Sequence, residues 1–90
     1  MAARFRAAGY DAQTARHVSP LLDFEGVDLV GTYPFQVQCK ASEKLGSHHT
    51  ILESMPDDNP LIVSILAHKR NRQGTTITMW VDDFFELIKK

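Results

Sequence analysis

Apolar and polar side chains alternate strictly between residues 35 and 41, and this pattern predicts a β-strand. The odd positions, such as Cys39, are apolar, and the even positions are polar. Gln38 and Lys40 therefore share one face of the predicted strand. A soluble domain seldom orders an amide and an ammonium two residues apart in a central strand without a use for them. This strand is the first candidate for a functional site.

Similar patterns predict the other elements of the chain. Helical spacing, capping residues and glycine or proline breaks predict helices over residues 2–8, 45–55 and 84–90. Apolar and β-branched runs predict strands over residues 12–18, 27–32, 35–41, 61–66 and 75–81. The order αβββαββα indicates an α/β (α+β) fold with a central mixed sheet of about five strands flanked by helices.

Length and composition narrow the class of protein. Ninety residues suffice for a single domain, residues 1–90, with one modest core. The chain has no run of about 18 apolar residues, so we expect no membrane span. Its N-terminal residues lack the apolar segment of a signal peptide. The one cysteine, Cys39, excludes an internal disulfide and suits a reducing compartment, which predicts a cytoplasmic protein.

A carboxylate, Asp28, lies on the strand predicted before this polar face, and the loop between the two strands decides whether it reaches Gln38. A three-residue loop over residues 32–34 pairs Gly31 with Phe35 and sets Asp28 opposite Gln38. A two-residue loop sets Asp28 opposite Cys39 instead. We expect the three-residue loop, or a bulge with the same effect.

Such a cluster suits phosphodiester hydrolysis with Mg²⁺ or Mn²⁺. Asp28 offers an anionic oxygen, the Gln38 side chain a neutral oxygen, and the backbone carbonyl of Cys39 a third ligand. Lys40 would orient a metal-bound water or stabilise charge on the phosphate. The alternative is purely structural, because an aspartate at a strand entry followed by a lysine on a later strand is a common pattern.

The segment Gly26-Val27-Asp28-Leu29-Val30, followed by Val37-Gln38-Cys39-Lys40, resembles the core motif of the PD-(D/E)XK nuclease superfamily. The Gln-Cys-Lys form is similar to that of Mrr-type restriction endonucleases, in which glutamine replaces the usual acidic residue. The layout also resembles small archaeal and phage Holliday-junction resolvases, with segments like 16–19 before the aspartate and 80–87 at the chain end.

The resemblance implies a restriction-endonuclease-like core with Asp28, Gln38 and Lys40 as catalytic residues. Asp28 matches the metal-binding aspartate, Gln38 the second acidic position and Lys40 the catalytic lysine. Ser19 matches a phosphate-contacting serine of the resolvases. One departure matters for activity: those families usually carry a glutamate on the first helix, and residues 1–8 contain no acidic residue.

Positive charge is concentrated at a predicted turn, although the whole chain has a net charge of −1 and a pI of about 6.4. The turn that carries Lys69, Arg70 and Arg72 is either a solvated hairpin tip or a surface that contacts DNA phosphates. Arg16 would add to the same surface. Arg4, Arg6, Lys44 and His49 could extend it. Adjacent histidines on a helix point about 100° apart, so His48-His49 does not predict a zinc site.

Apolar surface in residues 61–66 and 84–88 exceeds what a small core needs, which predicts a homodimer. The expected function is that of a Mg²⁺-dependent endodeoxyribonuclease acting on branched or duplex DNA, in a prokaryotic cell or a phage-infected host. We expect no membrane partner and no small-molecule cofactor. Two rival readings remain open: a DNA-binding module that cleaves weakly or not at all, and a dimeric interaction protein without a nucleic-acid role.

Overall fold

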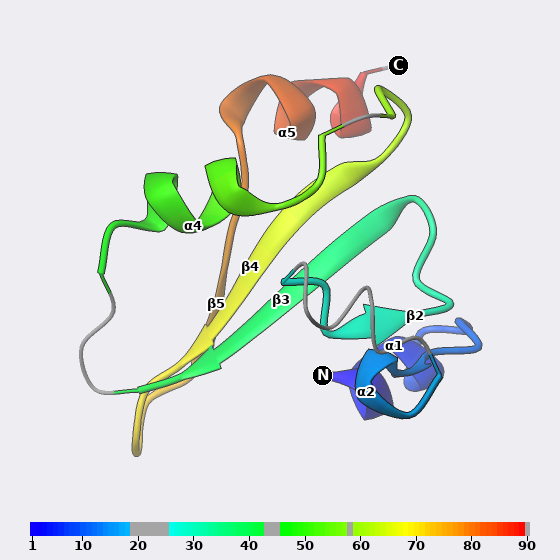
Figure 1. Cartoon of the computed structure of the whole chain (residues 1–90), viewed down its shortest axis with the longest axis vertical. Coiled ribbons are helices and arrows are strands. Elements are labelled where there is room, and N and C mark those ends of the chain that lie inside the picture. The colour runs from blue at the N-terminus through cyan, green and yellow to red at the C-terminus, as the bar shows by residue number, and fades with distance from the viewer. Residues whose placement is uncertain (19–25, 43–45, 58, 90) are drawn as a thin grey trace.

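The computed structural model describes residues 1–18, 26–42, 46–57 and 59–89. A mixed three-stranded sheet lies at its centre, and it consists of β3 Phe35–Ala41, β4 Val63–Lys69 and β5 Thr75–Thr78 (Figure 1). β3 and β4 are parallel, whereas β4 and β5 form an antiparallel hairpin. A separate antiparallel sheet pairs β1 Gln13–Thr14 with β2 Leu29–Val30. The α+β class and the mixed sheet are confirmed, but the described strands form two sheets instead of one.

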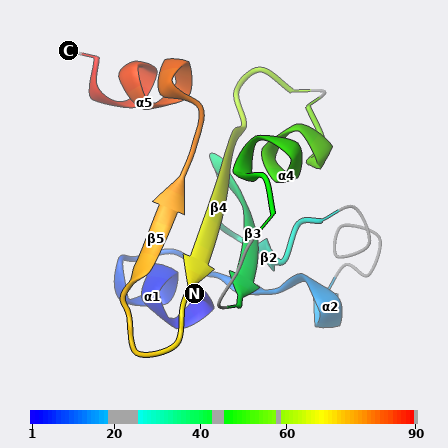
Figure 2. The ribbon, with the colours of Figure 1, turned by 90° about the vertical axis from the view of Figure 1, so that its left-hand side faces the viewer.

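Four helices accompany the strands in the described part of the chain: α1 Ala2–Ala7, α2 Ala15–Val18, α4 His48–Ser54 and α5 Val81–Ile88. The helix α4 connects the parallel strands β3 and β4, as a parallel pair requires. In Figure 2, α4 and α1 lie on either side of the sheet. The helix α5 follows β5 at the end of the sheet away from the β4–β5 turn. None of the described helices is long and apolar enough to cross a lipid bilayer.

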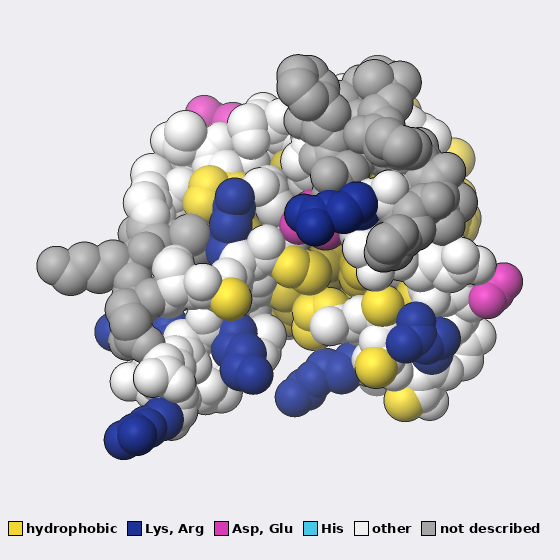
Figure 3. All heavy atoms as spheres, turned by 60° about the horizontal axis from the view of Figure 1, so that its bottom comes forward, with side chains coloured by type: hydrophobic (Ala, Val, Ile, Leu, Met, Phe, Trp, Pro, Cys, Tyr) yellow, Lys and Arg dark blue, Asp and Glu magenta, His cyan; other side chains and the backbone are white. Residues whose placement is uncertain are grey.

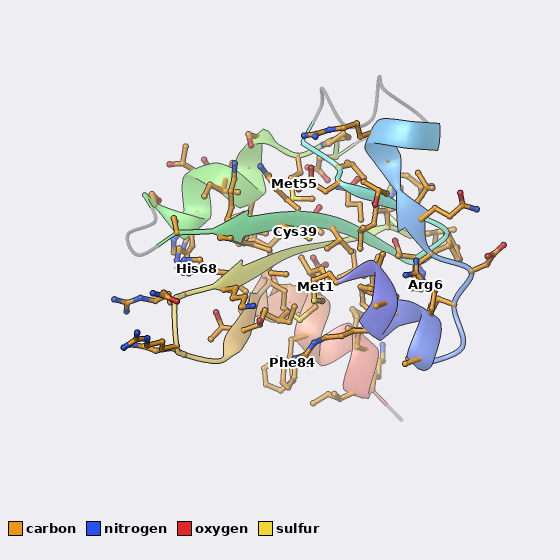
Figure 4. All side chains as sticks on the ribbon, turned by 90° about the horizontal axis from the view of Figure 1, so that it is seen from below. Met1, Arg6, Cys39, Met55, His68 and Phe84 are labelled. Carbon is orange, nitrogen blue, oxygen red and sulfur yellow. The ribbon has the colours of Figure 1, made fainter. Side chains whose placement is uncertain are left out.

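Alternation along β3 and β4 divides the core between the two faces of the sheet. Odd-numbered residues, including Val37 and Ile65, pack against Leu29 and α1 on one face. On the other face, Leu66 packs against Leu52 and Met55, which α4 and its C-cap provide. Figure 4 shows Met55 on one side of the sheet and Met1 and Phe84 on the other. The polar even positions of β3 therefore lie under α4 and beside β2.

The strands predicted over residues 12–18 and 27–32 are much shorter than expected. β1 ends after Thr14, where α2 begins, and β2 covers only Leu29 and Val30. Gly31 ends β2 because it has a φ of +77°. A Cβ at this position would overlap the backbone carbonyl of Asp11. The close approach of two backbones therefore requires glycine and bends the chain out of the ladder that would have continued into a hairpin with β3.

Three other boundaries differ from the prediction for local reasons. The helix expected over residues 45–55 starts at His48, since the Ser47 side chain accepts the Thr50 N–H at 3.2 Å. Leu61 is held in a turn by Asn59 Oδ1 at 2.9 Å, so β4 begins later and extends to Lys69. The last helix begins at Val81, before the residues expected to cap it, because the chain is extended only as far as Trp80.

Candidate functional site

Asp28 is fixed to the free edge of β3 by two hydrogen bonds. Its backbone N–H donates to the Val37 carbonyl at 2.7 Å, and its Oδ2 accepts the Cys39 N–H at 2.7 Å. These bonds bracket Gln38. The Asp28 carbonyl accepts the N–H of Ala15 at 2.8 Å, which ties the first residue of α2 to the same place. Asp28 is therefore held between β3 and α2, with Gln38 between its two bonding partners on β3.

The route by which Asp28 reaches this position differs from the predicted loop. Phe35 N–H donates to the Thr32 carbonyl at 2.8 Å and closes a two-residue turn over Tyr33 and the cis residue Pro34. The expected three-residue loop is therefore wrong. A regular ladder from this turn would set Asp28 opposite Cys39, but the bend at Gly31 shifts the pairing, so that Asp28 bonds to Val37. The bend has the effect that a bulge was expected to supply.

Gln38 carries an unusual buried atom. Its side-chain Oε1 is buried and has no hydrogen-bond partner in the described part of the chain. A Cβ on Gly26 would stand 3.3 Å from this oxygen, so the absence of a side chain at Gly26 leaves room for the amide. An unpaired buried carbonyl oxygen is costly unless it meets a donor or a cation. Because Gln38 lies between the two residues of β3 that bond to Asp28, this oxygen is a candidate ligand for a positive ion.

Cys39 supplies a backbone carbonyl and a half-buried thiol. Because the Cys39 N–H points to Asp28, its carbonyl points to the same edge of β3, away from β4. The side chain packs on the opposite face with the core that contacts α1, as expected of a small core residue. Burial raises the pKa of the Cys39 thiol above its ordinary value of 9.0, and the nearby Asp28 carboxylate raises it further. The thiol is therefore kept protonated.

Lys40 follows at the end of β3, where it is half-buried and lines a pocket of about 420 Å³. It stands in register with His68 of β4. The described residues show no ion pair between Lys40 and Asp28. The structure thus places Asp28 at the edge of β3 to which the Cys39 carbonyl points, with its bonds on either side of Gln38, and places Lys40 at the rim of a pocket at the end of the strand. Within the described ranges, no three His, Cys, Asp or Glu side chains form a metal-binding group.

The residues expected to contact DNA occupy two places. Arg16 is exposed on α2, next to the residue whose N–H bonds to Asp28. Lys69, Arg70 and Arg72 are exposed at the turn between β4 and β5, close to the end of β3. Ser19, the predicted phosphate contact, and Lys44 lie outside the described residues. Figure 3 shows Lys and Arg side chains around a hollow with a hydrophobic floor at this end of the molecule.

The sequence indicates Arg4 only as one of several residues that could extend the basic surface, and it does not predict a pocket there. Arg4 lines the same pocket as Lys40 and Lys69, although it lies far from both along the chain. Packing of α1 against the sheet brings it there, and no local pattern indicates that packing. Arg6, two residues later, donates instead to the Ala12 carbonyl at 2.9 Å (Figure 4 labels it). Arg4 therefore contributes charge to the pocket, whereas Arg6 holds the segment that follows α1.

The two adjacent histidines diverge, as their helical positions predict. His48 packs edge-on against His68 and lies 3.2 Å from the Thr78 hydroxyl, whereas His49 packs against Trp80. They do not form a chelating pair. Acidic side chains gather elsewhere, around a pocket of about 430 Å³ to which Glu53, Asp57, Asp82 and Asp83 contribute. The basic and acidic groups of the described chain therefore line separate pockets.

Comparison with known proteins gives no relative from which function could be transferred. No family model, no curated protein and no solved structure matches the chain at a significant level. The functional argument therefore rests on the geometry of the β3 edge and of the basic end of the sheet.

Proposed function

We propose that this protein is a metal-dependent DNA endonuclease, similar to the PD-(D/E)XK nucleases and acting on branched DNA. One observation carries the proposal: a carboxylate is anchored at the β3 edge by bonds on either side of Gln38, whose buried amide oxygen has no partner among the described residues. Oxygen donors of this kind are those that Mg²⁺ and Mn²⁺ prefer. The parallel β3–α4–β4 unit is compatible with a restriction-endonuclease-like core.

The residues divide the chemistry between them. Asp28, Gln38 Oε1 and the Cys39 carbonyl would hold Mg²⁺ or Mn²⁺, and the bound ion would supply a nucleophilic water and polarise the phosphate. Lys40 would stabilise the charge that develops on the phosphate oxygens. Attack of the water on phosphorus breaks one P–O ester bond and leaves one phosphate end and one hydroxyl end. With a single carboxylate, the site depends on the substrate phosphate to complete the coordination.

The DNA backbone would lie along the basic end of the sheet. Lys69, Arg70 and Arg72 provide charge at the β4–β5 turn, and Arg16 provides charge beside Asp28. Phosphate contacts of this type position a duplex without reading its sequence. They account for DNA binding by a chain whose overall charge is slightly negative.

A homodimer would present two such sites to a branched substrate. Val81, Phe85 and Ile88 form a stripe on α5, and they are 62, 59 and 51% exposed. Acidic residues Asp82 and Asp83 lie at the start of this helix and Lys89 at its end. Two copies of α5 packed antiparallel around a two-fold axis would therefore cover both stripes and bring opposite charges together.

Incubation with duplex, nicked and four-way-junction DNA tests the proposal. We expect Mg²⁺- or Mn²⁺-dependent cleavage, strongest on the junction and abolished by EDTA. Asp28→Asn should abolish cleavage because it keeps the hydrogen-bonding shape and removes the charge, and Lys40→Ala should reduce it at least about a hundredfold. Arg6→Ala is the control, since Arg6 is engaged with the Ala12 carbonyl. Unchanged cleavage in Asp28→Asn would overturn the assigned centre.

The principal rival is a DNA-binding module on the same fold. The described helix α1 has no acidic residue in its first turn and none among residues 1–8, which favours this rival. Junction binding without cleavage in any divalent metal would establish it. If neither binding nor cleavage occurs, a dimeric interaction protein is the remaining reading, and the α5 stripe would be its contact surface.

A further inference from the structure

A second candidate site adjoins the Asp28 centre at the end of β3, on the face of the sheet that carries α1. This pocket, of about 420 Å³, opens at the C-terminal ends of β3 and β4. Arg4, Lys40 and Lys69 line it from a helix and two strands, and no acidic side chain is among its described lining residues. Arg4 and Lys69 bring two cations to this pocket, and no carboxylate compensates them among its described lining residues, which makes it a site for an anion.

The charge and the donors of this pocket fit a phosphate monoester. A phosphate monoester carries a charge of about −1.5 to −2 at neutral pH, whereas a diester within a strand carries a single charge. Gln73 and Thr75 add neutral donors at the rim, beside the cations. A terminal phosphate would therefore gain more from Arg4 and Lys69 than would a phosphate in the middle of a strand.

An apolar groove adjoins the basic pocket. It has a volume of about 470 Å³, runs over the same face of the sheet between α1 and α5, and shares Arg4 with the pocket. The aromatic rings of Phe5, Phe35 and Phe84 line it. Phe5 and Phe35 lie with ring centroids 6.4 Å apart. Flat apolar walls of this kind accept a nucleobase, because every base has a π-face that packs against aromatic side chains.

We propose that the pocket and groove together bind a nucleoside phosphate monoester, with the phosphate against Arg4 and Lys69 and the base in the groove. The ligand is either a free mononucleotide or the phosphorylated end of a nucleic-acid strand. Asp28 lines neither cavity, so binding here does not depend on cleavage at the β3 edge. If the protein cleaves DNA as proposed, the same pocket would hold the phosphate end that cleavage creates.

Calorimetric titration in EDTA tests this site without any cleavage. The probes are a nucleoside, its 5′-monophosphate, inorganic phosphate, and one oligonucleotide with and without a 5′-phosphate. We expect the monophosphate to bind at least about tenfold tighter than either the nucleoside or inorganic phosphate. The phosphorylated oligonucleotide identifies the strand end as the ligand if it exceeds the mononucleotide, and the reverse order identifies the free nucleotide. Equal binding of nucleoside and monophosphate would overturn the proposal.

Matched variants distinguish binding in this pocket from binding through general surface charge. The double variant Arg4→Ala/Lys69→Ala should lose the preference for the phosphorylated ligands, whereas Arg6→Ala on the same helix should keep it. Asp28→Asn should also keep it, so failure of the proposed nuclease and failure of this pocket remain distinguishable. If the double variant unfolds, NMR on the wild-type protein decides: shifts at Gly74 and Thr75 support the pocket, and their absence overturns it.

Discussion

Asp28 satisfies a backbone N–H that a neighbouring strand would ordinarily satisfy. Its Oδ2 takes the place of a carbonyl opposite Cys39, at 2.7 Å, and this bond fixes the carboxylate beside Gln38. The Asp28 carboxylate can therefore stabilise the edge of β3 through one oxygen and still be a candidate metal ligand. It also predicts that the charge on Asp28 influences each of its neighbours, including the thiol on the other face of the strand.

Gln38→Glu should turn the weak oxygen cluster into a two-carboxylate site. Without metal, the added charge near Asp28 should lower the thermal unfolding temperature, since two partly buried carboxylates repel each other. With Mn²⁺, affinity should rise by about tenfold or more, and saturating metal should restore stability. Titration followed by thermal unfolding measures both effects. Adding Asp28→Asn to this variant should remove the gain, and an unchanged metal affinity would show that Gln38 lies outside any metal site.

The Cys39 thiol should make folding sensitive to alkaline pH. Burial and then the Asp28 carboxylate raise its folded-state pKa above the ordinary value of 9.0. The stability that the neutral thiol contributes is therefore complete below pH 9.0 and is lost as pH rises through the higher folded-state pKa. Denaturant unfolding between neutral and alkaline pH should show this loss, and Cys39→Ala should be less sensitive.

Alkylation of Cys39 by iodoacetamide reports the same pKa directly, because only the thiolate reacts. Asp28→Asn removes the second cause of the raised pKa, so the midpoint of the rate–pH profile should move to lower pH. A uniform rise in rate at every pH would instead indicate that the variant merely exposes the thiol.

At the scale of the elements, the prediction is accurate where the pattern of residues within the element itself determines the structure. The strand over residues 35–41 was correct to the residue, and the shared face of Gln38 and Lys40 follows from alternation alone. The segments 12–18 and 27–32 were predicted poorly because backbone contacts between distant residues decide them. The proximity of Asp28 to Gln38 was anticipated, although it arises from the bend at Gly31 and not from the loop. Arg4 could not be placed, since only the packing of α1 brings it to Lys40.

Gly31→Ala should be strongly destabilising. The substitution adds a Cβ that overlaps the Asp11 carbonyl, at a residue whose φ is +77°. We expect the free energy of unfolding to fall by at least about 2 kcal/mol, as measured in urea. Gly46→Ala is the control, since a Cβ there meets no atom within 4 Å, and its effect should stay within about 0.5 kcal/mol. Equal effects of the two substitutions would contradict the requirement for glycine at Gly31.

At the scale of the whole molecule, the proposed binding to DNA depends more on where the charges lie than on the net charge of −1. The turn bearing Arg70 and Arg72 should contact phosphates, whereas the carboxylates around the acidic pocket should stay away from DNA. Arg70→Ala/Arg72→Ala should weaken binding to all DNA sequences alike and reduce the slope of log K against log salt by about 2. Fluorescence anisotropy at several salt concentrations measures this slope. Unchanged binding would leave the turn as a solvated hairpin tip.

The proposed association through α5 gives a second prediction at the scale of the whole molecule. Phe85→Glu should convert a dimer to a monomer in sedimentation equilibrium, because it places charge at the centre of the exposed stripe. Leu61→Glu is the matched control: Leu61 is 67% exposed, but it lies outside α5. A dimer that survives Phe85→Glu would place the interface elsewhere.

The hydrogen bond between Asp28 and Cys39 also has a consequence for aggregation. β3 is an edge strand of the three-stranded sheet, and unpaired N–H groups on such strands recruit strands from other chains. The carboxylate occupies one of these N–H groups and adds a negative charge that repels another copy. Selection for solubility alone would therefore retain an acidic residue at this position, independently of any role in metal binding.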